Sequence, residues 1–164
     1  MDADSHPLSD DGGRWQTVIE ECRALAEDYE EDGWTVFAPV PGDVVPLPAP
    51  TDSKVRKVGF DLLLSGDEFA RLEELVTDAT FDEFEAFRAQ DGGVVYLSLV
   101  FKAPAAETAF CVPMYYRVAD ADRMLDRVRA GDPLRAYFHP LAGEDDVAFD
   151  LQDPSLVFPP EDVA

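Results

Sequence analysis

The chain has 164 residues, of which 46% are hydrophobic, and these values fit one globular domain with a substantial core. Its formal net charge is −22 and its Lys and Arg residues form no cluster, so we expect no direct binding to nucleic acid. It has no apolar run near 18 residues and no secretory pattern at its start, so we expect a cytoplasmic protein that makes no membrane contact.

The first predicted element is an amphipathic helix over residues 14–32, preceded by an acidic flexible tail at residues 1–13. The apolar side chains of the helix recur at a spacing of 3.6 residues and form one stripe, which contains Trp15, Val18, Ile19, Cys22, Leu25, Ala26 and Tyr29. Acidic residues occupy the opposite face, which we interpret as a solvated surface rather than a metal or partner site.

Residues 34–38 predict a short strand, after which five prolines occur between positions 39 and 50. This density disfavours a helix or a central strand, so residues 39–57 are interpreted as a stiff, extended connector. A ligand for a proline-recognition domain is the less favoured interpretation.

A strand and a capped helix follow the connector. Residues 58–64 predict the strand, and its alternation gives one apolar face with Phe60, Leu62 and Leu64. Ser65 and Glu68 match a capping box, which predicts a helix over residues 66–78.

The centre of the predicted fold is a meander of three strands over residues 81–89, 94–101 and 109–118. The middle strand is apolar at nearly every position, which is typical of a strand that is covered on both faces. The first strand has an alternative as a helix, because Thr80 and Glu83 also match a capping box. The double-glycine turn that follows it favours a hairpin, and we therefore predict a strand.

The third strand of the meander alternates clearly. Its apolar face contains Phe110, Val112, Met114, Tyr116 and Val118, and the other face contains Cys111, Pro113, Tyr115 and Arg117. Pro113 cannot donate to a ladder, so we expect it at an edge, at a bulge or on the free side of the strand.

The remaining elements are a helix over residues 120–130, with Asp120 as its cap, and strands over residues 134–139 and 147–151. Residues 155–158 predict a further short extended piece, and residues 159–164 a tail. Together these elements predict a single α+β domain over residues 14–158. It contains an antiparallel sheet with the three-stranded meander at its centre.

The predicted element order is α-β-β-α-β-β-β-α-β-β. The first eight elements follow the order of roadblock and profilin-like folds, and this resemblance implies a five-stranded antiparallel sheet with helices on its faces. It rests on order alone and implies no particular activity.

The acidic residues are spread over the whole chain, and Lys occurs only three times. This composition resembles that of cytosolic proteins from halophilic archaea, in which surface carboxylates are hydrated and molar salt screens their repulsion. Three segments are also similar to a haloarchaeal family of uncharacterised proteins, and they span residues 112–116, 139–141 and 147–158. That resemblance covers most of the chain and implies no activity, because the family has no assigned one.

The sequence offers little for catalysis. Cys111 and His139 are the only plausible pair of a nucleophile and a base, and no hydrolase signature surrounds either residue. No nucleotide-binding or zinc-protease motif is present, and two Cys and two His are badly spaced for structural zinc. We therefore expect no cofactor and no metal, and a binding protein rather than an enzyme.

The favoured binding residues are Tyr115 and Arg117 on the third strand of the meander, together with Asp61. Tyrosine and arginine are common in protein-binding hot spots, although an Arg–Asp pair across strands is the simpler structural interpretation. The sequence therefore predicts a protein-binding or assembly module whose partner is a second copy or another protein. The alternatives are an enzyme that uses Cys111 or His139, and an acidic mimic of nucleic acid.

Overall fold

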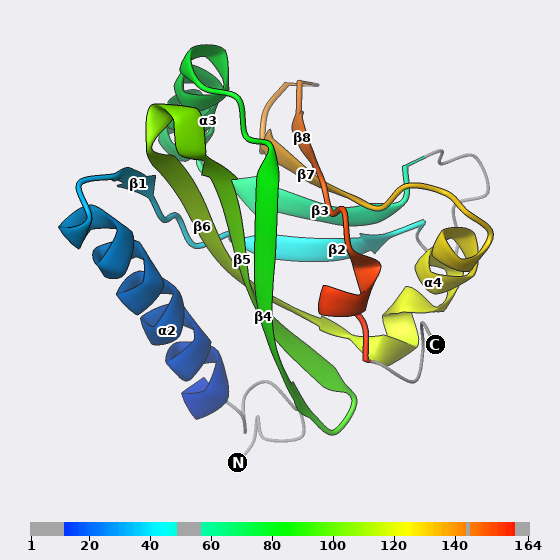
Figure 1. Ribbon diagram of the computed structural model, residues 1–164. Coiled ribbons are helices and arrows are strands. Elements are labelled where there is room, and N and C mark those ends of the chain that lie inside the picture. Colours follow the sequence, from blue (N-terminus) through cyan, green and yellow to red (C-terminus); the bar gives the residue numbers. More distant parts are fainter. Residues whose placement is uncertain (1–11, 49–56, 144, 160–164) are drawn as a thin grey trace.

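The computed structural model of the protein describes residues 12–48, 57–143 and 145–159. Two mixed sheets of four strands each pack with their inner faces against one another. Helix α2 (Gly12–Glu31) lies along the outer face of one sheet, called sheet A, and helices α3 (Gly66–Asp78) and α4 (Asp122–Arg129) lie at opposite ends of the two sheets (Figure 1). The α+β class predicted from the sequence is confirmed.

The strands divide between the sheets as follows. Sheet A has the order β1 (Thr35–Phe37), β6 (Thr108–Arg117), β5 (Val94–Ala103) and β4 (Glu83–Asp91). Sheet B has the order β2 (Asp43–Leu47), β3 (Gly59–Leu64), β7 (Arg135–Pro140) and β8 (Val147–Asp150). The helices are α2 (Gly12–Glu31), α3 (Gly66–Asp78) and α4 (Asp122–Arg129).

The predicted meander is present as β4, β5 and β6, but it does not belong to one wholly antiparallel sheet. Strand β1 is parallel to β6, and β3 is parallel to β7. The likeness in order to roadblock and profilin-like folds therefore does not extend to a five-stranded antiparallel sheet, because the strands divide between two packed layers.

Strand β2 lies inside the stretch for which the sequence predicts only a proline-rich connector. It contains Pro46, which has no N–H to donate. The proline is tolerated in this strand because β2 is the edge of sheet B and pairs only with β3. The described part of the chain therefore has one more strand than predicted. Residues 49–56 of the predicted connector, 1–11 of the first tail and 160–164 of the last tail lie outside the described residues.

Helix α2 follows the prediction closely. Every residue of the predicted apolar stripe is buried or half-buried, and the acidic residues between them are exposed. The helix packs on β6 and β5, so its stripe covers the outer face of sheet A. Helix α3 begins at the predicted capping box, with Ser65 and Glu68 each accepting from the other's backbone N–H.

Strand β5 is buried on both faces, as its sequence predicts. The side chains that face sheet B are Val95, Leu97, Leu99 and Phe101, and those on the α2 side are Val94, Tyr96, Ser98 and Val100. One face is therefore covered by a helix and the other by a second sheet.

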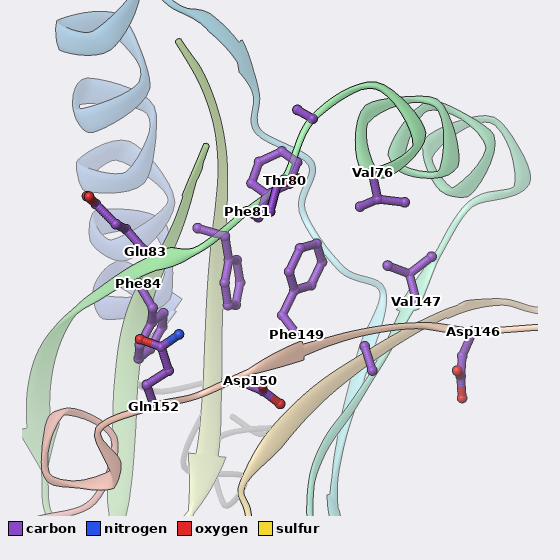
Figure 2. A pocket seen from close by; sticks show the side chains of 13 residues that line it. Val76, Thr80, Phe81, Glu83, Phe84, Asp146, Val147, Phe149, Asp150 and Gln152 are labelled. Atoms are coloured by element: carbon purple, nitrogen blue, oxygen red, sulfur yellow. The ribbon is translucent and has the colours of Figure 1, made fainter. Parts of the chain in front are cut away.

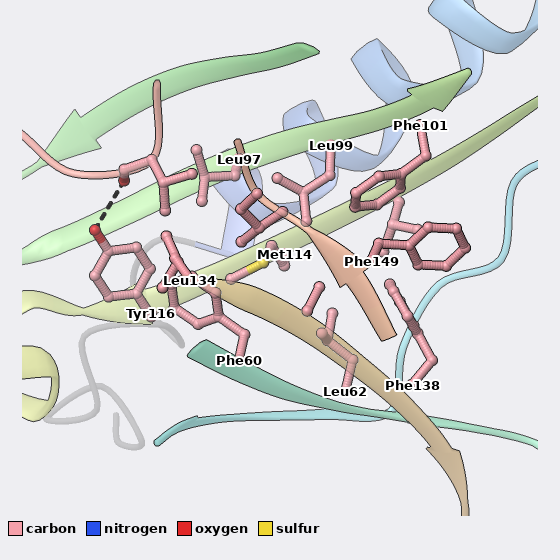
Figure 3. Close-up of a cluster of buried hydrophobic side chains, with 14 of the residues drawn as sticks. Phe60, Leu62, Leu97, Leu99, Phe101, Met114, Tyr116, Leu134, Phe138 and Phe149 are labelled. Carbon is pink, nitrogen blue, oxygen red and sulfur yellow. Dashed lines mark hydrogen bonds between the residues drawn. The ribbon is translucent and has the colours of Figure 1, made fainter. Parts of the chain in front are cut away.

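Four aromatic rings hold the two sheets together at one end of the core. Phe101 and Phe110 come from sheet A, and Phe138 and Phe149 from sheet B. All six ring pairs among them have centroids between 4.5 and 6.3 Å apart. Such pairs each contribute about 0.5–1.5 kcal/mol beyond the burial of their area. Three of these rings are labelled in Figure 3 among the side chains that fill the interior.

Hydrogen bonds from two side chains of sheet A, Tyr116 and Arg88, fasten the C-terminal segment to this sheet. The Tyr116 hydroxyl donates to the Val157 carbonyl at 2.9 Å, as Figure 3 shows. Arg88 of β4 donates from one guanidinium nitrogen to the carbonyls of Ser155 and Phe158 at 2.8 and 2.7 Å. This segment contains a 3-10 turn at Pro154–Leu156, so the extended piece predicted there is wrong.

Two smaller predictions about local structure have opposite outcomes. Strand β4 is a strand, and the capping box at Thr80 and Glu83 does not start a helix. Asp120 does not cap α4, because it lies in a 3-10 turn at Val118–Ala121 and Ala121 precedes the helix. The turn lengthens the connection from β6 and shifts the helix start by two residues.

Gly59 marks the closest approach of two strands in sheet B. Its φ of +145° is rarely adopted by residues with a side chain. A Cβ at this position would lie 1.7 Å from the Arg135 carbonyl oxygen, which belongs to the neighbouring strand β7. The parallel pairing of β3 with β7 therefore requires a residue without a side chain.

Candidate functional site

The candidate site is built around β4, because this strand is an open edge of sheet A. Val118 N donates to Gly93 O at 2.9 Å, and these two residues continue the β5–β6 register. Along an antiparallel ladder, hydrogen-bonded pairs alternate with pairs that are not hydrogen-bonded. Because Gly93 is bonded to β6, the backbone groups of the odd-numbered β5 residues bond β6, and those of the even-numbered β5 residues bond β4. The β4 residues opposite those even-numbered residues are odd-numbered.

It follows that the even-numbered residues of β4 direct their backbone N–H and C=O groups away from the sheet. These residues are Phe84, Ala86, Arg88 and Gln90. Among the described strands, β4 pairs only with β5, so the side of β4 that faces away from β5 is a free edge. The Arg88 end is close to the C-terminal segment through its two carbonyl contacts, so the first half of β4 is the more open part of the edge.

The same alternation explains Pro113. It lies opposite Ser98 in a pair that is not hydrogen-bonded, so its missing N–H points away from β5. Strand β1 pairs β6 only from Thr108 to Phe110, so Pro113 lies beyond the paired part on that side. The proline is therefore on a free side of the strand.

A groove lies beside the start of β4, between this strand and the edge strand β8; we call it the inner groove. It has a volume of about 530 Å³, which is within the range of ligand-binding clefts. Its aromatic lining consists of Phe81, Phe84, Phe101 and Phe149. The Phe81 and Phe149 rings, labelled in Figure 2, contact each other edge-on, with centroids 5.7 Å apart and ring planes at 86°.

The rim of the inner groove is acidic. Its charged lining residues are Glu83, Asp146 and Asp150, and no basic residue of the described chain lines it. Each of these carboxylates has a cationic partner outside the lining: Arg135 donates to Asp150 at 2.8 Å, Lys57 donates to Asp146 at 2.5 Å, and Lys102 lies 3.7 Å from Glu83.

Lys102 links the first half of β4 to its neighbours. Its ammonium donates to Glu85 at 2.7 Å, and Tyr29 of α2 donates to the same carboxylate at 3.4 Å. Burial tends to lower the pKa of Lys102, but the hydrogen bond that it donates to Glu85 and the nearby Tyr29 outweigh this effect, so the pKa is raised. The lysine therefore stays charged and holds β4 in register.

A second groove lies on the opposite side of β4, between this strand and α2; we call it the outer groove. Its volume is about 420 Å³. Helix α2 is joined to β4 at both ends, by the Arg14–Asp91 pair at 3.0 Å and by the Tyr29–Glu85 bond. Between these two contacts Phe87 remains 49% exposed, although it lies on an otherwise packed face.

The predicted binding residues on β6 face this helix-covered side. Tyr115 packs edge-on against Trp15, with ring centroids 5.0 Å apart, and also contacts Tyr96. Cys111 is fully buried with Cys22 beneath α2. Burial raises the pKa of both thiols to about 12, with a smaller contribution from Cys111 to that of Cys22 and from Glu30 to that of Cys111. Both thiols are therefore protonated at neutral pH.

Asp61 and His139 are brought together by sheet B. They lie on its outer face, and Asp61 Oδ2 is 2.9 Å from His139 Nε2. The other ring nitrogen, Nδ1, is 2.9 Å from the Pro140 carbonyl oxygen. Asp61 is therefore paired with His139 and does not form the expected pair with Arg117.

Cys111 and His139 do not share a cleft. Cys111 lies on the outer face of sheet A, and His139 lies on the outer face of sheet B, with the core between them. Packed sheets are about 10 Å apart, so this arrangement exceeds hydrogen-bond reach. Among the described residues, no group of three or more His, Cys, Asp or Glu side chains is arranged to hold a metal ion.

Neither groove is among the features predicted from the sequence. The inner groove depends on the pairing of two sheets, and nothing local in the sequence places β8 beside β4. The sequence does contain an indication of the outer groove. Strand alternation places Phe87 on the same side of β4 as the acidic Glu83 and Glu85, which is an unusual place for a large apolar side chain.

Fold and site together define a small α+β protein with two packed mixed sheets and an open edge strand flanked by two grooves. The chain belongs to a family of unknown function, DUF7529, whose model matches residues 2–159. No curated protein and no solved structure matches it. In the described part of the chain, no helix combines the length and hydrophobicity needed to cross a membrane.

Proposed function

We propose that the protein is a partner-binding module that captures an extended segment of another protein along the free edge of β4. The observation that carries this proposal is the outward direction of the Phe84 and Ala86 backbone groups next to two grooves. An added strand gains affinity from main-chain hydrogen bonds, and its alternate side chains enter pockets on the two faces. Here one set would enter the inner groove and the other would face the outer groove.

The negative charge of the chain favours a basic and apolar partner segment over a second copy of this chain. The net charge is −22, and β4 itself carries Glu83, Glu85 and Asp91. Two copies paired through β4 would bring like charges together, which is unfavourable. A segment that alternates apolar and basic residues would match the aromatic lining and the acidic rim of the inner groove.

A peptide titration tests the proposal. The probe is a seven-residue peptide that alternates Lys with Val or Phe, added to ¹⁵N-labelled protein. We expect saturable shifts of the β4 amides and slower hydrogen exchange at Phe84 and Ala86, whose N–H groups become bonded. Unchanged exchange at these two amides, or dimerisation through β4 without peptide, would contradict the proposal.

A proline substitution provides the matched variant. Ala86→Pro removes an outward N–H and leaves the bonds to β5 intact, because proline is tolerated on a free strand edge. We expect the variant to fold and to bind the peptide at least tenfold more weakly. Ala89→Pro is the contrasting variant, since it removes a bond to β5 and should lower the melting temperature.

We further propose that the protein works in the cytoplasm of a halophilic archaeon. The support is its acidic composition and the solvated carboxylates of α2, among them Glu20, Glu27 and Glu31. Screening extends over about 3 Å in molar salt and about 10 Å at 0.1 M, so repulsion grows as salt is removed. The melting temperature should therefore fall between 3 M and 0.1 M NaCl, and equal values at both would contradict this proposal.

A further inference from the structure

The outer groove has the composition of a ligand site. Its apolar walls are formed by Val18, Ala24, Leu25, Phe87 and Ala89. The groove lies along α2 between the two contacts that join this helix to β4. A concave site with apolar walls and a few polar groups is the usual form of a small-ligand pocket.

The polar group at the floor of the groove is Ser98. This residue is only 3% exposed, lines the groove, and makes no side-chain hydrogen bond with the described part of the chain. The Ser98 hydroxyl oxygen is therefore available to accept a hydrogen bond from a ligand.

The acidic groups of the groove are two carboxylates on α2. Glu21 and Asp28 both line it and are seven residues apart, so they lie on the same side of the helix. Neither forms an ion pair with another described residue. The cationic side chain in the lining, Arg88, has its guanidinium engaged by the carbonyls of Ser155 and Phe158.

We propose that the outer groove binds an alkylammonium group, meaning a hydrocarbon chain that ends in a cationic nitrogen. The hydrocarbon contacts Leu25 and Phe87, the nitrogen donates to the Ser98 hydroxyl, and Glu21 and Asp28 favour its positive charge. The exposed Phe87 ring adds an aromatic surface that also favours a cation. Such a group occurs on a free amine and on a lysine side chain.

A binding comparison tests the ligand class. Hexylammonium chloride, hexanol and sodium hexanoate have the same hydrocarbon and differ in charge, so each is titrated into ¹⁵N-labelled protein. We expect hexylammonium to bind at least tenfold more tightly than hexanoate and about fivefold more tightly than hexanol. Equal affinities for hexylammonium and hexanol, or no saturable binding of hexylammonium at 50 mM, would overturn the proposal.

Paired variants locate the site. Ser98→Ala should weaken hexylammonium binding about three- to tenfold, which is the effect of one hydrogen bond. Glu21→Gln with Asp28→Gln should weaken it about fivefold, whereas Glu20→Gln with Glu27→Gln changes two exposed carboxylates at the same spacing outside the groove. An equal loss in both double variants would show only general attraction to an acidic surface and would overturn the proposal.

The proposal stands apart from strand binding at β4. Ala86→Pro should keep its affinity for hexylammonium while losing the peptide, so failure of one proposal leaves the other intact. N-acetyl-lysine methylamide distinguishes the two sources of the group. Binding of this compound as tight as that of hexylammonium indicates a lysine of the partner segment, and much weaker binding indicates a free amine; both results support the ligand class.

Discussion

The two faces of sheet A are covered in different ways. The inner face meets a second sheet, and its side chains Leu97, Leu99, Val112 and Met114 are completely buried. The outer face meets one helix, which lies over β5 and β6 and leaves Phe87 of β4 half exposed. A sheet covers most of the width of another sheet, whereas a single helix about 10–12 Å wide covers only two or three strands spaced about 4.8 Å apart.

This difference separates stability from binding. The inner face provides the packed core that keeps the two sheets together, and it opens at its margin beside β4, where Phe84 and Phe101 line the inner groove. The outer face and the β4 edge combine incomplete cover with a defined framework, because the contacts of Arg14 and Tyr29 fix the helix on both sides of the gap. Substitutions on the two faces should therefore have different consequences.

The largest expected effect is on the inner face. Phe110→Ala removes one ring of the aromatic group and leaves a cavity, and we expect it to lower the free energy of unfolding by about 3–5 kcal/mol. Phe87→Ala on the outer face should change it by only about 0.5 kcal/mol, since half of this ring is already in water. Urea unfolding at fixed salt, followed by tryptophan fluorescence, measures both. Similar losses in the two variants would show that the faces do not differ as described.

A second effect, which depends on pH, is expected from the thiols beneath α2. Burial raises the pKa of Cys22 and Cys111 from 9.0 to about 12, so both bind their protons more tightly in the folded protein. Their contribution to stability is complete below pH 9 and is lost as the pH rises from 9 to 12. Each thiol adds a slope of up to about 1.4 kcal/mol per pH unit in this window.

The measurement is the free energy of unfolding between pH 9 and 12 for the wild type and for Cys22→Ala with Cys111→Ala. The variant should show a shallower decline, because other titrating groups are common to both proteins. Parallel curves would mean that the helix does not shield these thiols from water.

The smallest effect concerns the end of the sandwich near the C-terminal segment. Tyr116→Phe removes the bond to the Val157 carbonyl and should lower the free energy of unfolding by about 1 kcal/mol. Hydrogen exchange should accelerate at Val157 and Phe158 while the β5 amides keep their protection. Acceleration throughout sheet A would indicate that this bond supports the whole core and not only its margin.

Local patterns in the sequence predict much of this fold. The stripe of α2, the Ser65 cap of α3 and the buried strand β5 each depend on spacings within one element, and each is confirmed. The apolar faces of β3 and β6 are also as expected, because strand alternation is independent of the neighbour that covers it.

The errors arise where distant segments decide the outcome. Strand β2 forms at Pro46 because β3 offers an edge, and the division into two sheets follows from long-range pairing that no local period encodes. The expected grouping of Asp61 with Tyr115 and Arg117 fails for the same reason, since Asp61 belongs to sheet B and the other two to sheet A. The grooves beside β4 are likewise products of this division.

The close approach at Gly59 has a consequence for relatives of this chain. A methyl group there would overlap the Arg135 carbonyl oxygen, so the position tolerates no side chain while β3 and β7 remain neighbours. Family members that keep this sheet should carry glycine at the matching position, even where the surrounding hydrophobic residues have been exchanged for one another. That glycine then serves as a fixed point for aligning distant members, and it assigns the strand and its facing partner before any of their structures is known.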